Sequence, residues 1–174
     1  MFVMLRKLFC ILLCFMFLAI CAYSVQKSKA KATEPMALAD KDGRTTTLDS
    51  LLARNRGKVV YIDFWASVCA PCRRVIPLSQ KMREHYSDKD VVFVYIAVYD
   101  KVERWKAAAE DEGLNDGNCH SYIVTNPDRA SIGKHRVGAL PRFMLFDKQG
   151  KLVDSWAPYP MSKEIIAAID KLLK

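Results

Sequence analysis

The stretch that decides the fold is Lys58 to Arg73, which reads KVVYIDFWASVCAPCR. Its first half, Lys58–Trp65, is a nearly continuous apolar run, which predicts a strand buried on both faces of a sheet. Cys69 follows almost directly. Pro71 suits the first turn of a helix, where its missing N–H would have no partner. We therefore expect a buried strand, a short turn, and a helix that begins beside Cys69 and contains Cys72.

A cysteine at the start of a helix is chemically special. Free backbone N–H groups and about half a positive charge stabilise a thiolate there. Such surroundings lower the pKa of a cysteine from about 8.5 into the range of about 3.5–7.5. Cys72 lies one helical turn beyond Cys69. Cys69 could therefore attack a substrate disulfide, and Cys72 could resolve the mixed disulfide that forms.

Three other interpretations of the cysteine pair stay open. A purely structural disulfide would close a very short loop, which stabilises a fold by about 2 kcal/mol at most. Zinc usually takes four ligands, and no second pair with ligand spacing accompanies Cys69 and Cys72. The two thiols could also be simply buried. A strand–CxxC–helix order in an exported chain favours the redox interpretation.

The pattern on either side of this unit predicts the remaining elements. Before the motif we expect a hairpin of Ala37–Asp40 and Thr45–Leu48 and a short helix at Ser50–Arg54 capped by Asp49. From the motif onward we expect a helix from Pro71 to about Tyr86 that is kinked or restarted at Pro77, a buried strand at Val91–Val98 and a helix at Lys101–Gly113. The C-terminal part should contain a short helix near Asn126–Asp128, a hairpin of Arg142–Phe146 and Lys151–Ser155, and a closing helix at Ser162–Leu173. Two apolar strands joined by a helix predict a parallel βαβ unit. The expected fold class is α/β, with a mixed sheet between helices.

Residues 1–24 are typical of a targeting segment. Two basic residues precede an unbroken apolar run, Leu8–Ala22, which is short for a bilayer span. It is interpreted as a signal peptide cleaved after Ser24, a lipoprotein signal at Cys21, or an uncleaved anchor. A buried core helix is the purely structural alternative. The first three place the rest of the chain outside the cytoplasm. Residues 25–36 are polar and Lys-rich, which predicts a linker to one domain at 37–174.

Composition excludes some classes of function. The chain has 174 residues, 51% hydrophobic and 26% charged, with a formal net charge of +8. Its Lys and Arg are scattered rather than arranged in a stripe with aromatic residues, which argues against nucleic-acid binding. Only Cys69, Cys72 and Cys119 lie beyond the leader, too few for a disulfide framework. Cys119 is interpreted as a buried bystander or an accessory redox thiol, and Trp105 and Trp156 as packing residues.

The chain resembles the thioredoxin superfamily. Residues 61–73 resemble its active-site strand and loop, and Pro77 falls where that family kinks its helix. Leu140–Phe143 and residues 145–153 look like the later part of TlpA/ResA-like exported thioredoxins, and residues 118–137 resemble the insertion that such proteins carry. The resemblance covers about Leu38–Leu173. It implies a thioredoxin fold, a central mixed sheet flanked by helices, with an N-terminal β-hairpin extension.

The resemblance also assigns roles. Cys69 becomes the nucleophile and Cys72 the resolving cysteine, Pro141 a cis-proline that faces them, and Asp63 the buried acid beneath them. The strand alternation independently places Asp63 among apolar neighbours, where burial should raise its pKa and let it accept a proton from Cys72. A partly solvated aspartate with a structural hydrogen bond is the alternative. Val68 departs from the family, because many relatives have Trp there.

The function implied is thiol–disulfide oxidoreduction on exported proteins, with cytochrome c maturation as one suggested process. The dipeptide Ala70-Pro71 lacks the His of strongly oxidising relatives, which favours a reductant. The expected partners are exported protein thiols and disulfides and a membrane electron donor, with membrane contact through the leader and with no nucleic acid and no cofactor. The expected location is periplasmic, free or membrane-tethered. Alternatives are a copper chaperone using Cys69, Cys72 and a distal His, or a non-catalytic envelope domain.

Overall fold

The computed structural model describes residues 14–24, 35–126, 131–132 and 135–174. The chain divides into two compact units, residues 1–34 and 35–174. In the first unit, residues 14–24 are helical. No helix among the described residues has both the length and the apolar character needed to cross a membrane. Residues 1–13 of the expected leader, most of the expected linker and most of the expected helix near Asn126 lie outside the described residues.

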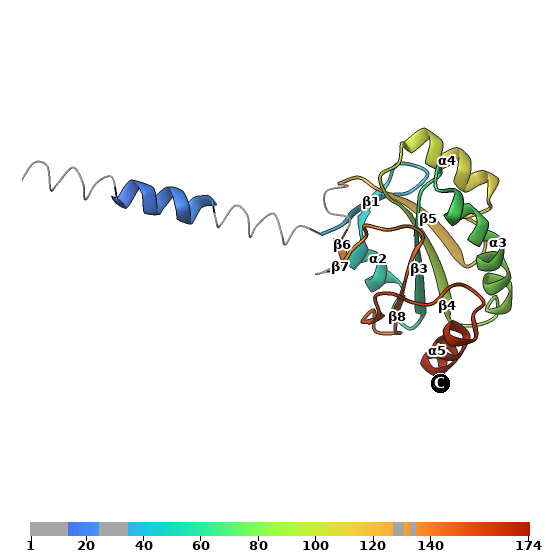
Figure 1. Ribbon diagram of the computed structural model, residues 1–174. Coiled ribbons are helices and arrows are strands. Elements are labelled where there is room, and N and C mark those ends of the chain that lie inside the picture. The colour runs from blue at the N-terminus through green and yellow to red at the C-terminus, as the bar shows by residue number, and fades with distance from the viewer. Residues whose placement is uncertain (1–13, 25–34, 127–130, 133–134) are drawn as a thin grey trace, which may run out of the picture. The chain divides into compact units, whose positions relative to one another are not determined.

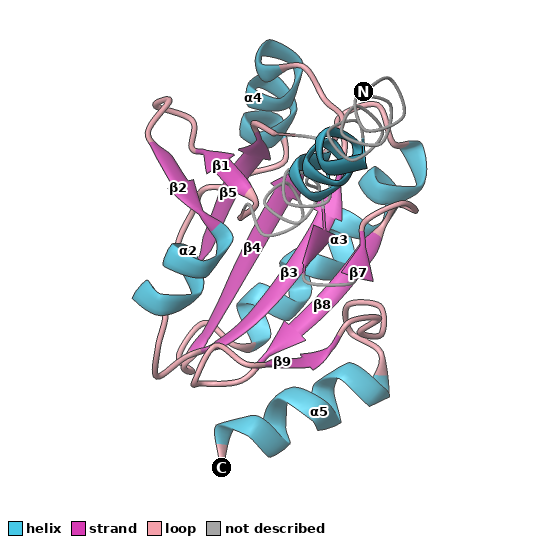
Figure 2. Cartoon of the chain, turned by 90° about the vertical axis from the view of Figure 1, so that its left-hand side faces the viewer, coloured by secondary structure: helices cyan, strands magenta, loops and turns pink. Residues whose placement is uncertain are grey.

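A seven-stranded mixed sheet forms the centre of the second unit (Figure 2). Its order is β2-β1-β5-β4-β3-β8-β9. The strands are β1 (Ala37–Ala39), β2 (Thr45–Thr47), β3 (Val59–Trp65), β4 (Val91–Ala97), β5 (Cys119–Val124), β8 (Arg142–Phe146) and β9 (Leu152–Asp154). β3, β4 and β5 run parallel, and the other pairs are antiparallel. A separate small ribbon pairs β6 (Ser131–Ile132) with β7 (His135–Arg136). The predicted parallel unit and both predicted hairpins are confirmed.

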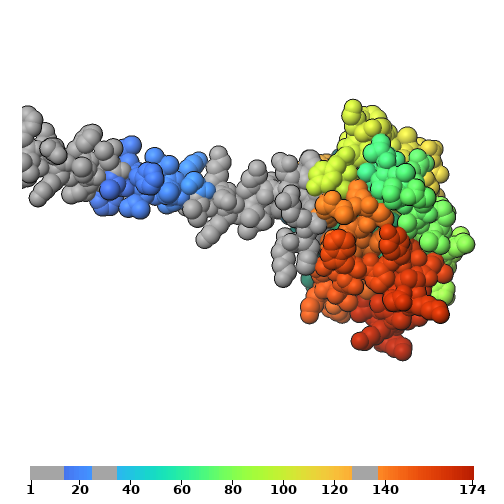
Figure 3. Space-filling view, viewed as in Figure 1, coloured from blue at the N-terminus to red at the C-terminus, as the bar shows by residue number. Residues whose placement is uncertain are grey.

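Helices cover both faces of this sheet (Figure 1). They are α2 (Leu48–Arg54), α3 (Ala70–His85), α4 (Val102–Asp111) and α5 (Lys163–Leu173). Alternate side chains of β3 and β4 divide between two cores. The first core holds residues such as Tyr61 and Phe93 and is covered by α3, α4 and α5, while the second holds residues such as Ile62 and is covered by α2. In Figure 3 the C-terminal segment, orange to red, lies beside the green surface of α3.

The structure corrects three details of the sequence analysis. Thr47, not Asp49, caps α2, because its hydroxyl accepts the Ser50 N–H at 3.1 Å. α3 runs through Pro77 as one helix and does not restart there. The strand β5 was not predicted at all. Its inward residues include Ser121, a polar side chain that receives the indole N–H of Trp105 at 2.8 Å, so the apolar alternation is hidden.

The fold brings two distant loops to the same end of the sheet. β3 ends at Trp65, and the chain turns there into α3. β8 is the antiparallel neighbour of β3, with Phe64 opposite Arg142. Because β8 begins where β3 ends, Pro141 lies at the same end as the Cys69 turn. This shared end is where the predicted site residues converge.

Candidate active site

Cys69 and Cys72 form a disulfide at the start of α3. Their Cα atoms are 5.3 Å apart, and Cys69 is the N-cap residue of the helix. The backbone N–H of Cys72 donates to Cys69 Sγ at 3.2 Å. Donors and the positive end of the helix dipole at this sulfur would stabilise a thiolate in the reduced protein.

The two sulfurs differ in accessibility. Cys69 is half-buried, and the neighbouring Val68 is exposed, so a substrate can reach the first sulfur. Cys72 is only 1% exposed and packs into the first core. A reachable first cysteine and an enclosed second one suit attack followed by internal resolution.

The turn that presents Cys69 is held from outside the motif. The Cys69 N–H donates to the Ala66 carbonyl at 3.0 Å, which closes the turn. Ser67 inside it donates its N–H and its hydroxyl to the carboxylate of Asp100, at 2.5 and 2.9 Å. The Asp100 side chain is fully buried and also accepts the Lys101 N–H at 2.8 Å. The sequence pattern does not single out Asp100, although an acid just after a buried parallel strand lies where ligand-binding loops gather.

Asp63 lies on β3 among apolar side chains, as the alternation predicts. It is 3% exposed, and burial raises the pKa of its carboxyl well above the usual range. Its Oδ1 has no hydrogen-bond partner among the described residues. The alternation turns it toward the first core, which Cys72 also enters. This is the environment of a carboxyl group whose neutral form is favoured by burial.

Pro141 follows a cis peptide bond from Leu140, as predicted. The next residue, Arg142, is buried, and its guanidinium carbon lies 3.3 Å from the ring centroid of Trp156. The sequence predicts that Trp156 is a packing residue, yet it is 65% exposed. An indole on the surface therefore covers a buried cation beside the cis-proline, a pairing that the sequence did not suggest. Trp105, by contrast, is fully buried as expected.

The remaining candidates do not join this site. Cys119 is buried on β5, where Arg83 donates to its sulfur. Burial raises the pKa of the Cys119 thiol, and the Arg83 charge partly opposes that effect. Within the described residues, no three or more His, Cys, Asp or Glu side chains form a group that could hold a metal ion.

Comparison with known proteins agrees with this geometry. A family model described as thioredoxin-like matches residues 57–152. The thiol-disulfide oxidoreductase ResA of Bacillus thuringiensis is 26% identical over 124 residues, which cover 71% of this chain and 66% of ResA. The chain thus spans a little under two thirds of that relative's length. The thioredoxin-like protein YneN of Bacillus subtilis is 29% identical over 126 residues, covering 70% of this chain and 69% of YneN.

Solved structures show the same fold. A crystal structure of a candidate thiol-disulfide oxidoreductase from Bacteroides vulgatus has a TM-score of 0.66 and 28% identity. The match covers 80% of this chain and 93% of the Bacteroides vulgatus chain. A thiol-disulfide oxidoreductase from Bacteroides fragilis has a TM-score of 0.64, with 80% and 98% covered, but at 17% identity it supports the fold alone.

Proposed function

The chain belongs to the thioredoxin-like family, and from that premise we propose that it is a thiol–disulfide oxidoreductase in which Cys69 and Cys72 react. One observation carries the proposal: Cys69 is reachable at the start of α3, while Cys72 lies buried one turn deeper. A purely structural role is less favoured, because closing a loop this short with a disulfide stabilises a fold by only about 2 kcal/mol.

The reaction follows from the two positions. In the reduced protein the Cys69 thiolate attacks a substrate disulfide, forming a mixed disulfide and releasing one substrate thiolate, which takes a proton from solvent. Cys72 then gives its proton to ionised Asp63 and attacks the Cys69 sulfur. The mixed disulfide breaks, the second substrate thiolate leaves and is protonated by solvent, and the Cys69–Cys72 disulfide forms. Two electrons pass to the substrate, and a dithiol donor must restore the reduced protein.

Asp63 fits the role of proton acceptor. Burial raises the pKa of its carboxyl, so its conjugate base is a better proton acceptor than that of an exposed aspartate. Its unpartnered Oδ1 leaves an acceptor position free. Pro141 is proposed to shape the substrate surface beside Cys69, since its loop lies at the same end of the sheet.

We extend the proposal to location and direction. The basic, then apolar, leader supports a domain outside the cytoplasm, free or tethered in the periplasm. The absence of His from Ala70-Pro71 supports a reductant of exported proteins, fed by a membrane electron donor. Haem-site disulfides in cytochrome c maturation are one substrate class that this chemistry would serve.

Trapping tests the assignment of the two cysteines. Cys72→Ser should accumulate mixed disulfides with client proteins, because the attacking thiol remains and the resolving thiol is gone. Cys69→Ser should accumulate few, because Cys72 is enclosed. Affinity capture of both variants and non-reducing gels measure the difference, with Cys119→Ser as the matched control. Equal trapping by the Cys69 and Cys72 variants would overturn the assignment.

Two further measurements separate the alternatives. Insulin-disulfide reduction by the wild type, compared with the Cys69→Ser variant, tests for turnover. Titration of the reduced protein with cuprous ion tests the copper chaperone. The reduction potential of the Cys69–Cys72 pair decides the direction of electron flow. A reductant requires a potential nearer that of thioredoxin, about −270 mV, than that of a strongly oxidising relative, about −120 mV.

A further inference from the structure

A cluster of buried polar atoms without protein partners lies between α3 and the sheet. Within the described part of the chain, Asp63 Oδ1, Ser79 Oγ and Tyr95 OH have no partner in hydrogen-bond geometry, although the Ser79 hydroxyl lies near enough to Tyr95 to lower the pKa of the phenol. Their residues are 3%, 0% and 1% exposed. An unsatisfied buried polar group destabilises a fold, and native proteins usually satisfy such groups with protein partners or ordered water. Three polar groups are enough to hold one water molecule.

The strand register makes these groups neighbours. Asp63 on β3 pairs directly with Tyr95 on β4, so their side chains stand side by side on the face that α3 covers. Ser79 is buried on α3. The pKa of Tyr95 is raised, first by burial and then by the nearby charge of Asp63, while Arg83 and the Ser79 hydroxyl act in the opposite direction. Tyr95 therefore has Asp63, Ser79 and Arg83 as neighbours.

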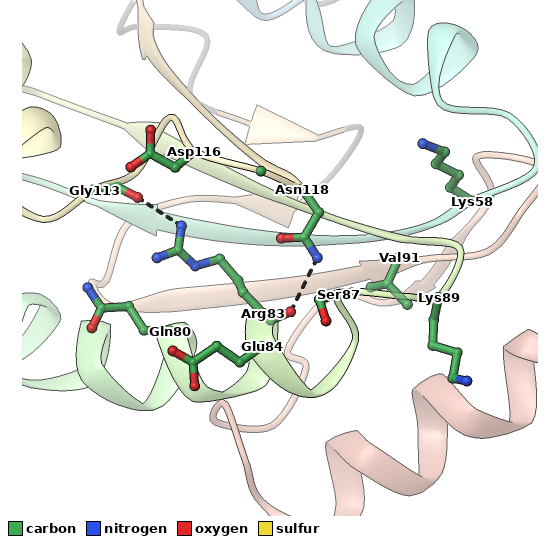
Figure 4. Close-up of a pocket in the computed structure, with 11 residues that line it drawn as sticks. Lys58, Gln80, Arg83, Glu84, Ser87, Lys89, Val91, Gly113, Asp116 and Asn118 are labelled. Carbon is green, nitrogen blue, oxygen red and sulfur yellow. Dashed lines mark hydrogen bonds between the residues drawn. The ribbon is translucent and has the colours of Figure 1, made fainter.

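The cluster reaches solvent at Arg83. Arg83 follows Ser79 by one helical turn, and its guanidinium carbon lies 5.7 Å from the centroid of the Tyr95 ring. Its Nη1 donates to the Gly113 carbonyl at 2.9 Å (Figure 4). The same side chain lines an open groove of about 730 Å³, together with Gln80, Glu84, Asp116 and Asn118. The polar groups thus extend from Asp63 to this open groove, whose lining includes neither Cys69 nor Cys72.

We propose that internal water held by Asp63, Ser79 and Tyr95 carries the Asp63 proton to the groove beside Arg83. This rests on the proposed function, in which Asp63 takes a proton from Cys72 and must lose it before the next turnover. The proton passes from the Asp63 carboxyl to the internal water, which releases one to groove solvent. No electron moves, and the carboxylate is regenerated. Without this path, Asp63 could exchange its proton with solvent only past the Cys69–Cys72 disulfide, at the face where the substrate binds.

Other titratable and charged groups face the same layer and enter the test. They are Tyr61 on β3, Cys72 and Arg83 on α3, Tyr86 at the C-terminal end of α3, Cys119 on β5, and Tyr159 before α5. Tyr61 provides a matched control. It lies two residues from Asp63 on the same face, but its hydroxyl donates to the Pro158 carbonyl at 2.8 Å and takes no part in the cluster.

A pH jump on the oxidised protein tests the path without any substrate. The infrared carboxyl band that disappears in Asp63→Asn reports protonation of Asp63, and its relaxation after the jump gives the exchange rate. Tyr95→Phe and Ser79→Ala should each slow that rate about tenfold, the effect of about 1.4 kcal/mol on the barrier. Tyr61→Phe should leave it unchanged. Slowing in only one of the two variants would support the path with that residue as its essential member.

Two outcomes would overturn the path. One is wild-type exchange in both Tyr95→Phe and Ser79→Ala, and the other is equal slowing in Tyr61→Phe. Ser79→Ala serves if Tyr95→Phe does not fold, and circular dichroism establishes folding for each. Because the readout is titration of Asp63 and not turnover, failure here leaves the trapping result standing. Failure of trapping leaves the exchange rates standing in the same way.

Discussion

Asp100 holds Ser67 by two hydrogen bonds, from the Ser67 N–H at 2.5 Å and from its hydroxyl at 2.9 Å. The carboxylate lies in the loop between β4 and α4, while Ser67 lies in the turn two residues before Cys69. The contact therefore fixes a reactive turn to a neighbouring strand. Asp100 also forms an ion pair with the half-exposed Arg104, whose Nε lies 3.7 Å from Asp100 Oδ1.

Asp100→Ala should destabilise the protein and slow the attack by Cys69. It leaves the Ser67 N–H buried without a partner, which costs about 1–3 kcal/mol, and it loosens the turn. Denaturant unfolding and the reaction of the reduced protein with a small disulfide measure the two effects. The matched variant Arg104→Ala should change stability by less than about 1 kcal/mol, because an exposed ion pair contributes little. Equal effects of the two variants would contradict the role of Asp100.

Asp63→Asn should stabilise the protein, and the gain should grow with pH. Burial raises the pKa of Asp63 in the folded state above its value of about 3.8 in the unfolded chain. Its favourable contribution is complete below pH 3.8 and is lost as pH rises through the folded pKa, since the unfolded state ionises first. Unfolding free energies at pH 4 and pH 7 measure this. The exposed Asp111→Asn is the control, and a gain for Asp63→Asn that does not depend on pH would contradict the prediction.

Cys119 should be inert in the native oxidised protein. It is the one thiol of residues 35–174 outside the disulfide. Burial raises its pKa and closes access, so alkylation should be at least about a hundredfold slower than in denaturant. Mass spectrometry after iodoacetamide measures both rates. Rapid labelling of the native protein would instead favour the accessory redox interpretation.

The mature protein should show that its leader has been processed or anchored in the membrane. We expect an intact mass that corresponds to cleavage after Ser24 or to a diacylglyceryl group on Cys21; an uncleaved anchor would leave full-length protein in the membrane fraction. Intact-mass analysis of protein from fractionated cells distinguishes these products. A full-length, unmodified protein in the cytoplasm would contradict all three.

Local sequence was sufficient for the reactive centre. The apolar run of β3, the helix start at Cys69 and the apolar run of β4 lie within about forty residues. Strand burial, helix initiation and thiolate stabilisation depend on near neighbours, so the pattern predicts them. The same alternation predicted the burial of Asp63. The roles proposed for Asp63 and Pro141 stay predictions until they are tested.

Only the tertiary structure decided which residues surround that centre. β5 escaped prediction because the Trp105 indole satisfies its inward Ser121, a contact that exists only after α4 packs on the sheet. Asp100 reaches Ser67 across 33 residues of sequence, and Asp63 meets Tyr95 across a parallel register. A one-residue shift in register would turn Tyr95 to the other face. Periodicity within a segment determines which face is buried, but the pairing of distant segments determines which polar groups meet there.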